Sequence, residues 1–204
     1  MGLISNGSTI FDAGSMSAGF GGSMVFIKKL TASGSATLSF VDGASGVVLD
    51  DTYKEYYFTF NNIHPATNGG RLSFQTSTDG GSNYGVTLTS TAIEAYHAEN
   101  DSVAVLGYAA SLDIAQGTGF QPLNSGVGTD ADQSTSGSLS IYNPSNTTFV
   151  KHFITDMHEA YHGDFATHSI QAGYFNTTSA IDAVQFKMHS GNIDAGDICL
   201  YGIA

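Results

Sequence analysis

The chain has 204 residues, of which 41% are hydrophobic and only 12% are charged, and its formal net charge is −12. This length and hydrophobic share suit one folded domain with a sizeable core and exclude a disordered chain. The 6 basic residues against 18 acidic ones argue against a nucleic-acid groove or an anionic membrane surface as partner. Cys199 is the single cysteine, which excludes an internal disulfide framework and a multi-thiolate metal site.

The first segment, residues 1–22, is rich in Gly and Ser and shows weak patterning. We expect it to be an irregular N-terminal arm that orders against a neighbouring molecule. It lacks the basic and apolar regions of a secretory signal, and no apolar run in the chain approaches the length of a membrane span. We therefore expect a protein that is made in a cytosol and does not enter a membrane.

From Ser23 onward, short segments with strand character follow one another at regular spacing. The strongest is 53–63, in which Tyr56, Phe58, Phe60 and Asn62 alternate with polar or smaller residues. The full set of predicted strands is 24–30, 37–41, 53–63, 71–76, 84–90, 93–97, 103–108, 138–142, 147–155, 168–175, 180–188 and 197–203. Asp79-Gly80-Gly81, between 71–76 and 84–90, predicts a hairpin turn.

Strand segments this frequent, separated by Gly, Asn and Asp, are typical of an all-β sandwich or barrel. The polar stretch 124–137 is interpreted as a surface loop rather than a domain boundary. The sequence therefore predicts an arm, residues 1–22, and one antiparallel, jelly-roll-like β-sandwich domain, residues 23–204.

Several local patterns together resemble a class of small virion proteins of tailed bacteriophages, especially phages of marine bacteria. These patterns are the opening 3–12, the run 26–32 leading into 36–40, the aromatic start 53–56 with 61–65, the turn 77–81 and the closing run 193–203. The resemblance implies a jelly-roll domain that decorates a capsid or belongs to a tail. It brings no catalytic residues with it.

One motif points to a different function. His158-Glu159-Ala160-Tyr161-His162 matches H-E-x-x-H, and His168 follows at the spacing of a third zinc ligand in the extended metzincin form. That chemistry requires a helix, because only helical i and i+4 positions place both imidazoles on one face with the Glu as base. The motif also needs Gly where this chain has Phe165, and the segment from residue 149 alternates equally well as a strand. We expect no zinc protease.

Two further alternatives stay open at this point. His152, His158, His162 and His168 crowd one third of the chain and could hold a metal between subunits, although exposed loop histidines are the simpler interpretation. A carbohydrate- or receptor-binding module would use exposed tyrosines at strand ends, and strands favour tyrosine in any case. The tyrosines considered for this role are Tyr53, Tyr56, Tyr84, Tyr96 and Tyr108.

The sequence thus favours a non-enzymatic virion structural protein, either a capsid decoration (cement) protein or a tail accessory protein. Its expected partners are major capsid or tail proteins and further copies of itself, with a trimer as one possible number, since the edge strands of an open sandwich need covering. We expect no cofactor, no resident metal, no nucleic acid and no membrane partner. The carbohydrate-binding module and the zinc protease are the first and second alternatives.

Overall fold

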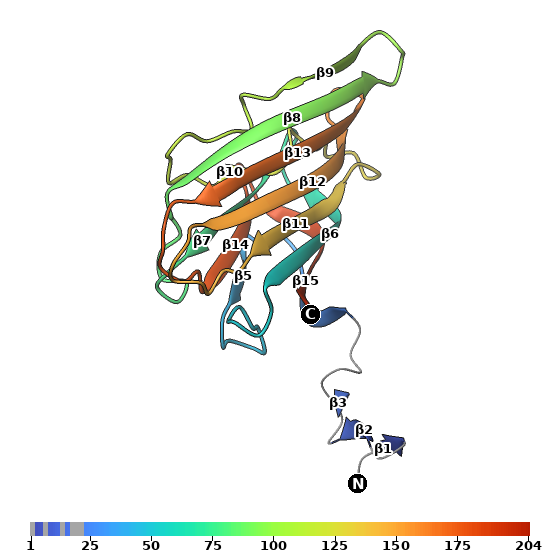
Figure 1. Ribbon diagram of the computed structural model, residues 1–204. Helices are drawn as coiled ribbons and strands as arrows, with labels where there is room; N and C mark the ends of the chain where they lie inside the picture. Colours follow the sequence, from blue (N-terminus) through green and yellow to red (C-terminus); the bar gives the residue numbers. More distant parts are fainter. Residues whose placement is uncertain (1–2, 6–7, 13–14, 17–22) are drawn as a thin grey trace.

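The computed structural model describes residues 3–5, 8–12, 15–16 and 23–204 (Figure 1). Before Ser23 it contains three short strands, β1 (Leu3–Ser5), β2 (Ser8–Asp12) and β3 (Ser15–Met16), which form a small antiparallel sheet. The rest of the predicted arm lies outside the described residues. No helix occurs in the described ranges, and so none there could cross a membrane.

Residues 23–204 form two antiparallel sheets that pack face to face as a β-sandwich, as the sequence predicts. The large sheet has eight strands in the order β4-β15-β6-β11-β12-β13-β8-β9, and the small sheet has four in the order β10-β7-β14-β5. Their bounds are β4 (Met24–Thr31), β5 (Leu38–Val41), β6 (Glu55–Pro65), β7 (Leu72–Ser77), β8 (Leu88–Ala98), β9 (Ala104–Tyr108), β10 (Gln121–Pro122), β11 (Thr135–Tyr142), β12 (Lys151–Tyr161), β13 (Phe165–Phe175), β14 (Ala183–Met188) and β15 (Ile193–Ile203).

Eight of these strands pair as nested antiparallel partners. With β8, β9, β12 and β13 set aside, the first strand pairs with the last, β4 with β15, and the second with the seventh, β5 with β14. The third pairs with the sixth, β6 with β11, and the fourth with the fifth, β7 with β10. The chain therefore follows the course of one long hairpin folded over into two layers.

The other four strands extend the large sheet beyond β11. The hairpin β12–β13 is inserted between β11 and β14, and the pair β8–β9 is inserted between β7 and β10. Both insertions join the same side of the sheet, where β13 pairs with β8 over the whole length of both strands. We call β12, β13, β8 and β9 the extension, and it occupies the upper part of Figure 1.

The hydrophobic core lies between the two sheets. Phe186 on β14 is at its centre, with its ring 5.3 Å from those of Phe58 and Phe60 on β6 and 6.1 Å from that of Phe40 on β5. Phe74 on β7 stacks on Phe186 and meets Phe153 on β12 edge-on at 5.2 Å. Edge-on and offset pairs of this kind add to the free energy gained by burial.

The alternation predicted for 53–63 is confirmed as far as Phe60. Tyr56, Phe58 and Phe60 are buried, but Asn62 is exposed and Ile63 takes the buried position. The register between β6 and β11 shifts at this point and Asn62 has φ of 50°, so a β-bulge reverses the facing of the residues that follow.

The predicted hairpin around Asp79 is wrong. β7 belongs to the small sheet and pairs with β10 and β14. Of the predicted strand 84–90, only residues 88–90 are in a strand, and they open β8 of the large sheet, which also contains 93–97. Gly80 and Gly81 do adopt positive φ, 72° and 78°. The turn redirects the chain from one layer to the other, and Asp182 fixes it by accepting the N–H of Gly80 at 2.9 Å.

Candidate functional site

The H-E-x-x-H segment is a strand, and the helix that a zinc protease requires is not formed there. Side chains of β12 alternate between buried and exposed from Lys151 onward. Glu159 is therefore buried against the interior, while His158 points outward on the opposite face. A base and a ligand on opposite faces of a sheet cannot act on one metal-bound water.

Glu159 instead anchors a loop. Its carboxylate accepts the N–H groups of Ser125 and Gly126 at 2.9 and 3.1 Å and a hydrogen bond from the Asn124 amide. Burial raises the pKa of Glu159, and the charge of nearby Glu94 raises it further, against the lowering effect of these hydrogen bonds. The contacts account for the conformation of the loop and leave no oxygen of Glu159 open to a ligand.

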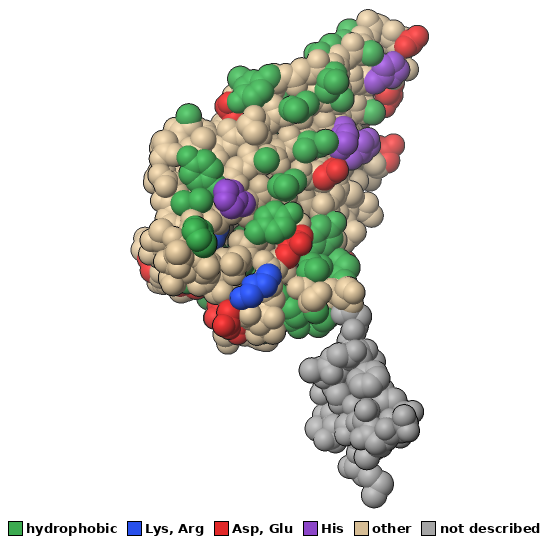
Figure 2. Space-filling view, in the orientation of Figure 1, with side chains coloured by type: hydrophobic (Ala, Val, Ile, Leu, Met, Phe, Trp, Pro, Cys, Tyr) green, Lys and Arg blue, Asp and Glu red, His purple; other side chains and the backbone are tan. Residues whose placement is uncertain are grey.

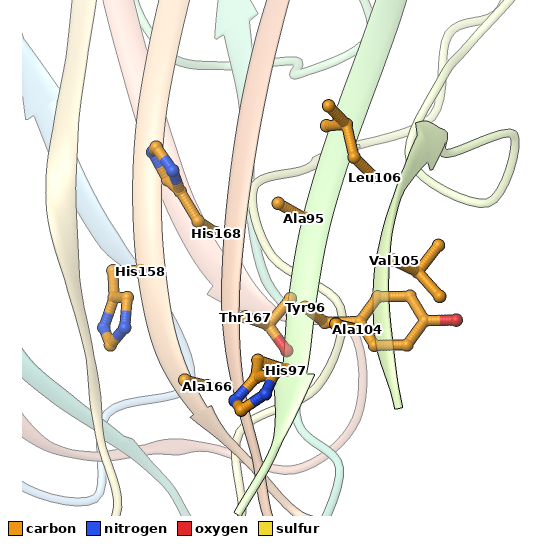
Figure 3. Close-up of a pocket in the computed structure, with 10 residues that line it drawn as sticks. All are labelled: Ala95, Tyr96, His97, Ala104, Val105, Leu106, His158, Ala166, Thr167 and His168. Atoms are coloured by element: carbon orange, nitrogen blue, oxygen red, sulfur yellow. The ribbon is translucent and has the colours of Figure 1, made fainter. Parts of the chain in front are cut away.

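The four clustered histidines do not converge on one point. His158 and His168 oppose each other on β12 and β13, on the outer face of the extension (Figure 3). His168 Nε2 lies 2.8 Å from Asp156 Oδ1. His152 lies at the other end of β12, and the ring of His162 is turned to the carbonyl of Gly126 at 3.1 Å. Within residues 23–204, no three His, Cys, Asp or Glu residues are grouped so as to hold a metal ion.

The two faces of the extension reverse the usual arrangement of a sandwich. Its inner face carries buried polar side chains, among them Thr167, Ser169 and Gln171 of β13. Its outer face carries large exposed hydrophobic side chains, which Figure 2 shows among the histidines on that side of the molecule. These residues, which we call the apolar outer face, are Ile93, Leu106, Tyr108, Ile154 and Ile170, exposed by 53, 75, 61, 46 and 45%.

Strand register brings these side chains into rows. Ile170 on β13 is directly opposite Ile93 on β8, which is opposite Tyr108 on β9. In the next row, His168 is opposite Ala95 and Ala95 is opposite Leu106. A shallow hollow lies on the other side of this second row, between it and the row of Ala166, His97 and Ala104 (Figure 3). Exposed apolar side chains that gather on one sheet face, as they do here around the His168–Asp156 pair, mark interaction sites in soluble proteins.

A second candidate site is a polar cleft of about 330 Å³ on the inner side of the extension. Its walls come from five separate parts of the chain, which the sandwich brings together. The lining residues are Arg71, Glu94, Tyr96, Ser111, Ser125, Tyr161, Phe165 and Thr167. We call this the polar cleft.

Charged and aromatic groups are fixed in position around the polar cleft. The Arg71 guanidinium donates to the carbonyl oxygen of Ser125 at 2.8 Å, and the Glu94 carboxylate accepts a hydrogen bond from the Ser125 hydroxyl. The Phe165 ring meets those of Tyr96 and Tyr161 edge-on, at 5.7 and 5.9 Å. The cleft thus combines a cation, a carboxylate, hydroxyl groups and ring surfaces, a mixture that suits a polar, uncharged ligand such as a sugar.

Only one of the tyrosines considered from the sequence lies in the polar cleft, namely Tyr96. Tyr56 is fully buried in the core, and Tyr53 packs against it at 5.8 Å. Tyr84 lies beside the turn at Asp79, and Tyr108 belongs to the apolar outer face. Sequence reasoning missed Arg71, Glu94, Ser125, Tyr161 and Phe165, which have no common spacing that could have revealed them.

Comparison with known proteins gives no relatives: no protein-family model, no curated protein and no solved structure matches this chain.

Proposed function

We propose that this protein is a non-enzymatic structural component of a virus particle of the tailed-bacteriophage type, either a capsid decoration (cement) protein or a tail accessory protein. The apolar outer face is the observation that carries this proposal. A monomer that acts alone gains nothing from five large exposed hydrophobic side chains on one sheet, whereas a protein that is held in a lattice buries them on assembly.

The fold supports the same function. Eight strands pair in a nested order, the first with the last and the second with the seventh, down to the fourth with the fifth. This is the connectivity of a jelly roll, a fold that forms viral capsid domains as well as lectin domains. We therefore take the sandwich as a jelly roll with two insertions. Its expected partners are the major capsid or tail proteins, and its expected location is the virion.

Attachment to particles tests the proposal. The tagged chain should be expressed in bacteria that produce the phage particles. It should then co-sediment with these particles in a density gradient, with a fixed number of copies per particle. Ile154→Lys combined with Ile170→Lys should remove it from the particle fraction, because two charges would have to be buried at the contact. Thr178→Lys combined with Ser179→Lys, which adds the same two charges at exposed loop positions, should leave attachment unchanged. A chain that is absent from particles contradicts the proposal.

The polar cleft favours carbohydrate binding as a second candidate function. Its aromatic rings and fixed polar groups are the kinds of group that a sugar-binding site uses, and the jelly-roll fold also occurs in lectins. On a glycan array, the wild-type chain should be retained by a defined set of sugars, and Tyr161→Ala should abolish this retention. Tyr174→Ala, which removes a tyrosine from outside the cleft, should preserve it. Equal retention of the two variants would contradict a sugar site here.

A further inference from the structure

The strand β9 forms one edge of the large sheet and is exposed along its whole length. Within the described part of the chain its single neighbour is β8. An edge strand of this kind presents backbone N–H and C=O groups that can pair with another strand.

The hydrogen-bonding register shows which groups of β9 face outward. Ala98 donates its N–H to the carbonyl of Val103 at 2.9 Å, and Ala109 donates to the carbonyl of Ala92 at 3.0 Å. Bonded and non-bonded residue pairs alternate along an antiparallel ladder, so Val105 and Gly107 complete the bonded set with β8. The residues between them, Ala104, Leu106 and Tyr108, therefore direct their N–H and C=O groups away from the sheet.

The chemistry of β9 leaves this edge unprotected. Its sequence is Ala-Val-Leu-Gly-Tyr, without a charge or a proline, whereas the opposite edge strand, β4, carries Lys28 and Lys29. Large apolar side chains are exposed on both of its faces, with Leu106 on one and Val105 on the other. Natural proteins cover or charge such edges to prevent uncontrolled pairing.

The edge is complementary to itself. Its outward-facing residues are at positions 104, 106 and 108, and so they are symmetric about Leu106. A two-fold axis at Leu106 would pair it with Leu106 of a second copy and would pair Ala104 with Tyr108, which satisfies all the outward donors and acceptors. Two copies that each carry −12 repel one another, and the five residues of β9 add no charge to this repulsion.

We propose that β9 pairs antiparallel with β9 of a second copy, in this register, to form a two-fold dimer. The large sheets of the two copies then join into one continuous sheet, and their apolar outer faces meet across the axis in the row that contains Ala95 and Leu106. Isologous pairing closes the contact at two copies, so the edge does not propagate into a fibre. The inference concerns the free protein and does not depend on a role in a virion.

A cysteine at the axis tests the register directly. Bonded residue pairs on antiparallel strands have Cα atoms about 5.5 Å apart, which is within the reach of a disulfide. The full-length Leu106→Cys variant should therefore form a covalent dimer under mild oxidation. Ile170→Cys, equally apolar and exposed on the same face but two strands from the edge, should not. The native Cys199 is buried and should remain reduced.

Sedimentation tests the dimer without a cross-link. The wild type should sediment as a dimer, and Leu106→Pro should sediment as a monomer with an unchanged circular dichroism spectrum, because the N–H that proline removes points outward. A monomeric or trimeric wild type would overturn the proposal, as would a dimer that tolerates the proline and yields no Leu106→Cys cross-link.

The reaction of the Leu106→Cys thiol with iodoacetamide gives a further check. If the variant is a monomer and its thiol is protected from iodoacetamide, the chain covers its own β9 edge, and this result also overturns the proposed dimer.

Discussion

The side-chain amide of Asn124 donates a hydrogen bond to the carboxylate of Glu159, and the oxygen of the same amide accepts the N–H of Leu72 at 2.6 Å. Asn124 thereby joins β12 of the large sheet to β7 of the small sheet. The orientation of its amide is determined by these two contacts, since a flipped group would place donor against donor at Leu72.

Glu159→Gln should therefore lower the free energy of unfolding by about 1–3 kcal/mol, since the new amide presents either a second donor to Asn124 or a donor to the loop N–H groups. Urea denaturation of the two proteins measures this difference. A glutamate that served only as a catalytic base would tolerate the change without loss of stability, and an unchanged unfolding midpoint would contradict the structural role.

The same carboxyl group should give the stability a specific pH dependence. Burial raises the pKa of Glu159 above 4.5, so between 4.5 and the raised pKa the folded chain binds more protons than the unfolded chain. The contribution of this group to stability must then fall as the pH increases through that window. Urea denaturation at a series of pH values should show the wild type losing stability relative to Glu159→Gln across the window. A relative gain would contradict the shift.

Phe186 should be among the residues whose truncation costs most. Its ring contacts those of Phe40, Phe58, Phe60 and Phe74 at the centre of the core. Phe186→Ala should lower the free energy of unfolding by about 3–5 kcal/mol, because the free energy gained by burying the ring is lost and a cavity is left in the core. Phe149→Ala deletes an equal ring that is 69% exposed, and it should change stability by no more than about 0.5 kcal/mol.

The turn after β7 should contain an unusually acidic carboxyl group. Hydrogen bonds from the Asn83 side chain, the Ser77 hydroxyl and the Asn83 backbone lower the pKa of Asp79 to about 2. The stability that this group contributes is present above pH 3.8 and is lost as the pH falls toward 2. NMR titration should find this low pKa and should find it raised toward 3.8 in Asn83→Ala, with Asp197 unchanged as internal reference.

Most strands could be predicted from the sequence because the alternation of apolar and polar residues within each strand indicates which of its side chains are buried. In β12 the alternation of Lys151, Phe153 and Met157 with exposed residues already indicates a strand with a buried Glu159, in spite of the H-E-x-x-H motif. Which strands pair with one another is not indicated by the residues of a single strand. The turn at Gly80 and Gly81 has the backbone conformation of a tight turn, but this local conformation does not indicate which layer the chain enters next. The contact that holds the turn comes from Asp182, about a hundred residues later.

The candidate site was the least predictable part for the same reason. The polar cleft takes Arg71 from before β7, Glu94 and Tyr96 from β8, and Tyr161 from the end of β12. These segments become neighbours only because two insertions join the same side of one sheet. By contrast, the apolar outer face could have been inferred, because Ile154 and Ile170 break the polar pattern that an exposed strand face normally shows.

The nested pairing also sets the order in which the sandwich can be completed during synthesis. β15 lies between β4 and β6, and the backbone N–H of Ala204 bonds to the carbonyl of Ser23 at 2.9 Å. Until β15 has emerged from the ribosome, β4 has no partner among the strands of the sandwich, and β6 has one open edge. The inner pair, β7 with β10, can close early, but the outermost pair must wait for the last strand to emerge. Contacts between residues this far apart in sequence make folding slow, and β4 and β6 keep unpaired edges until β15 has been synthesised.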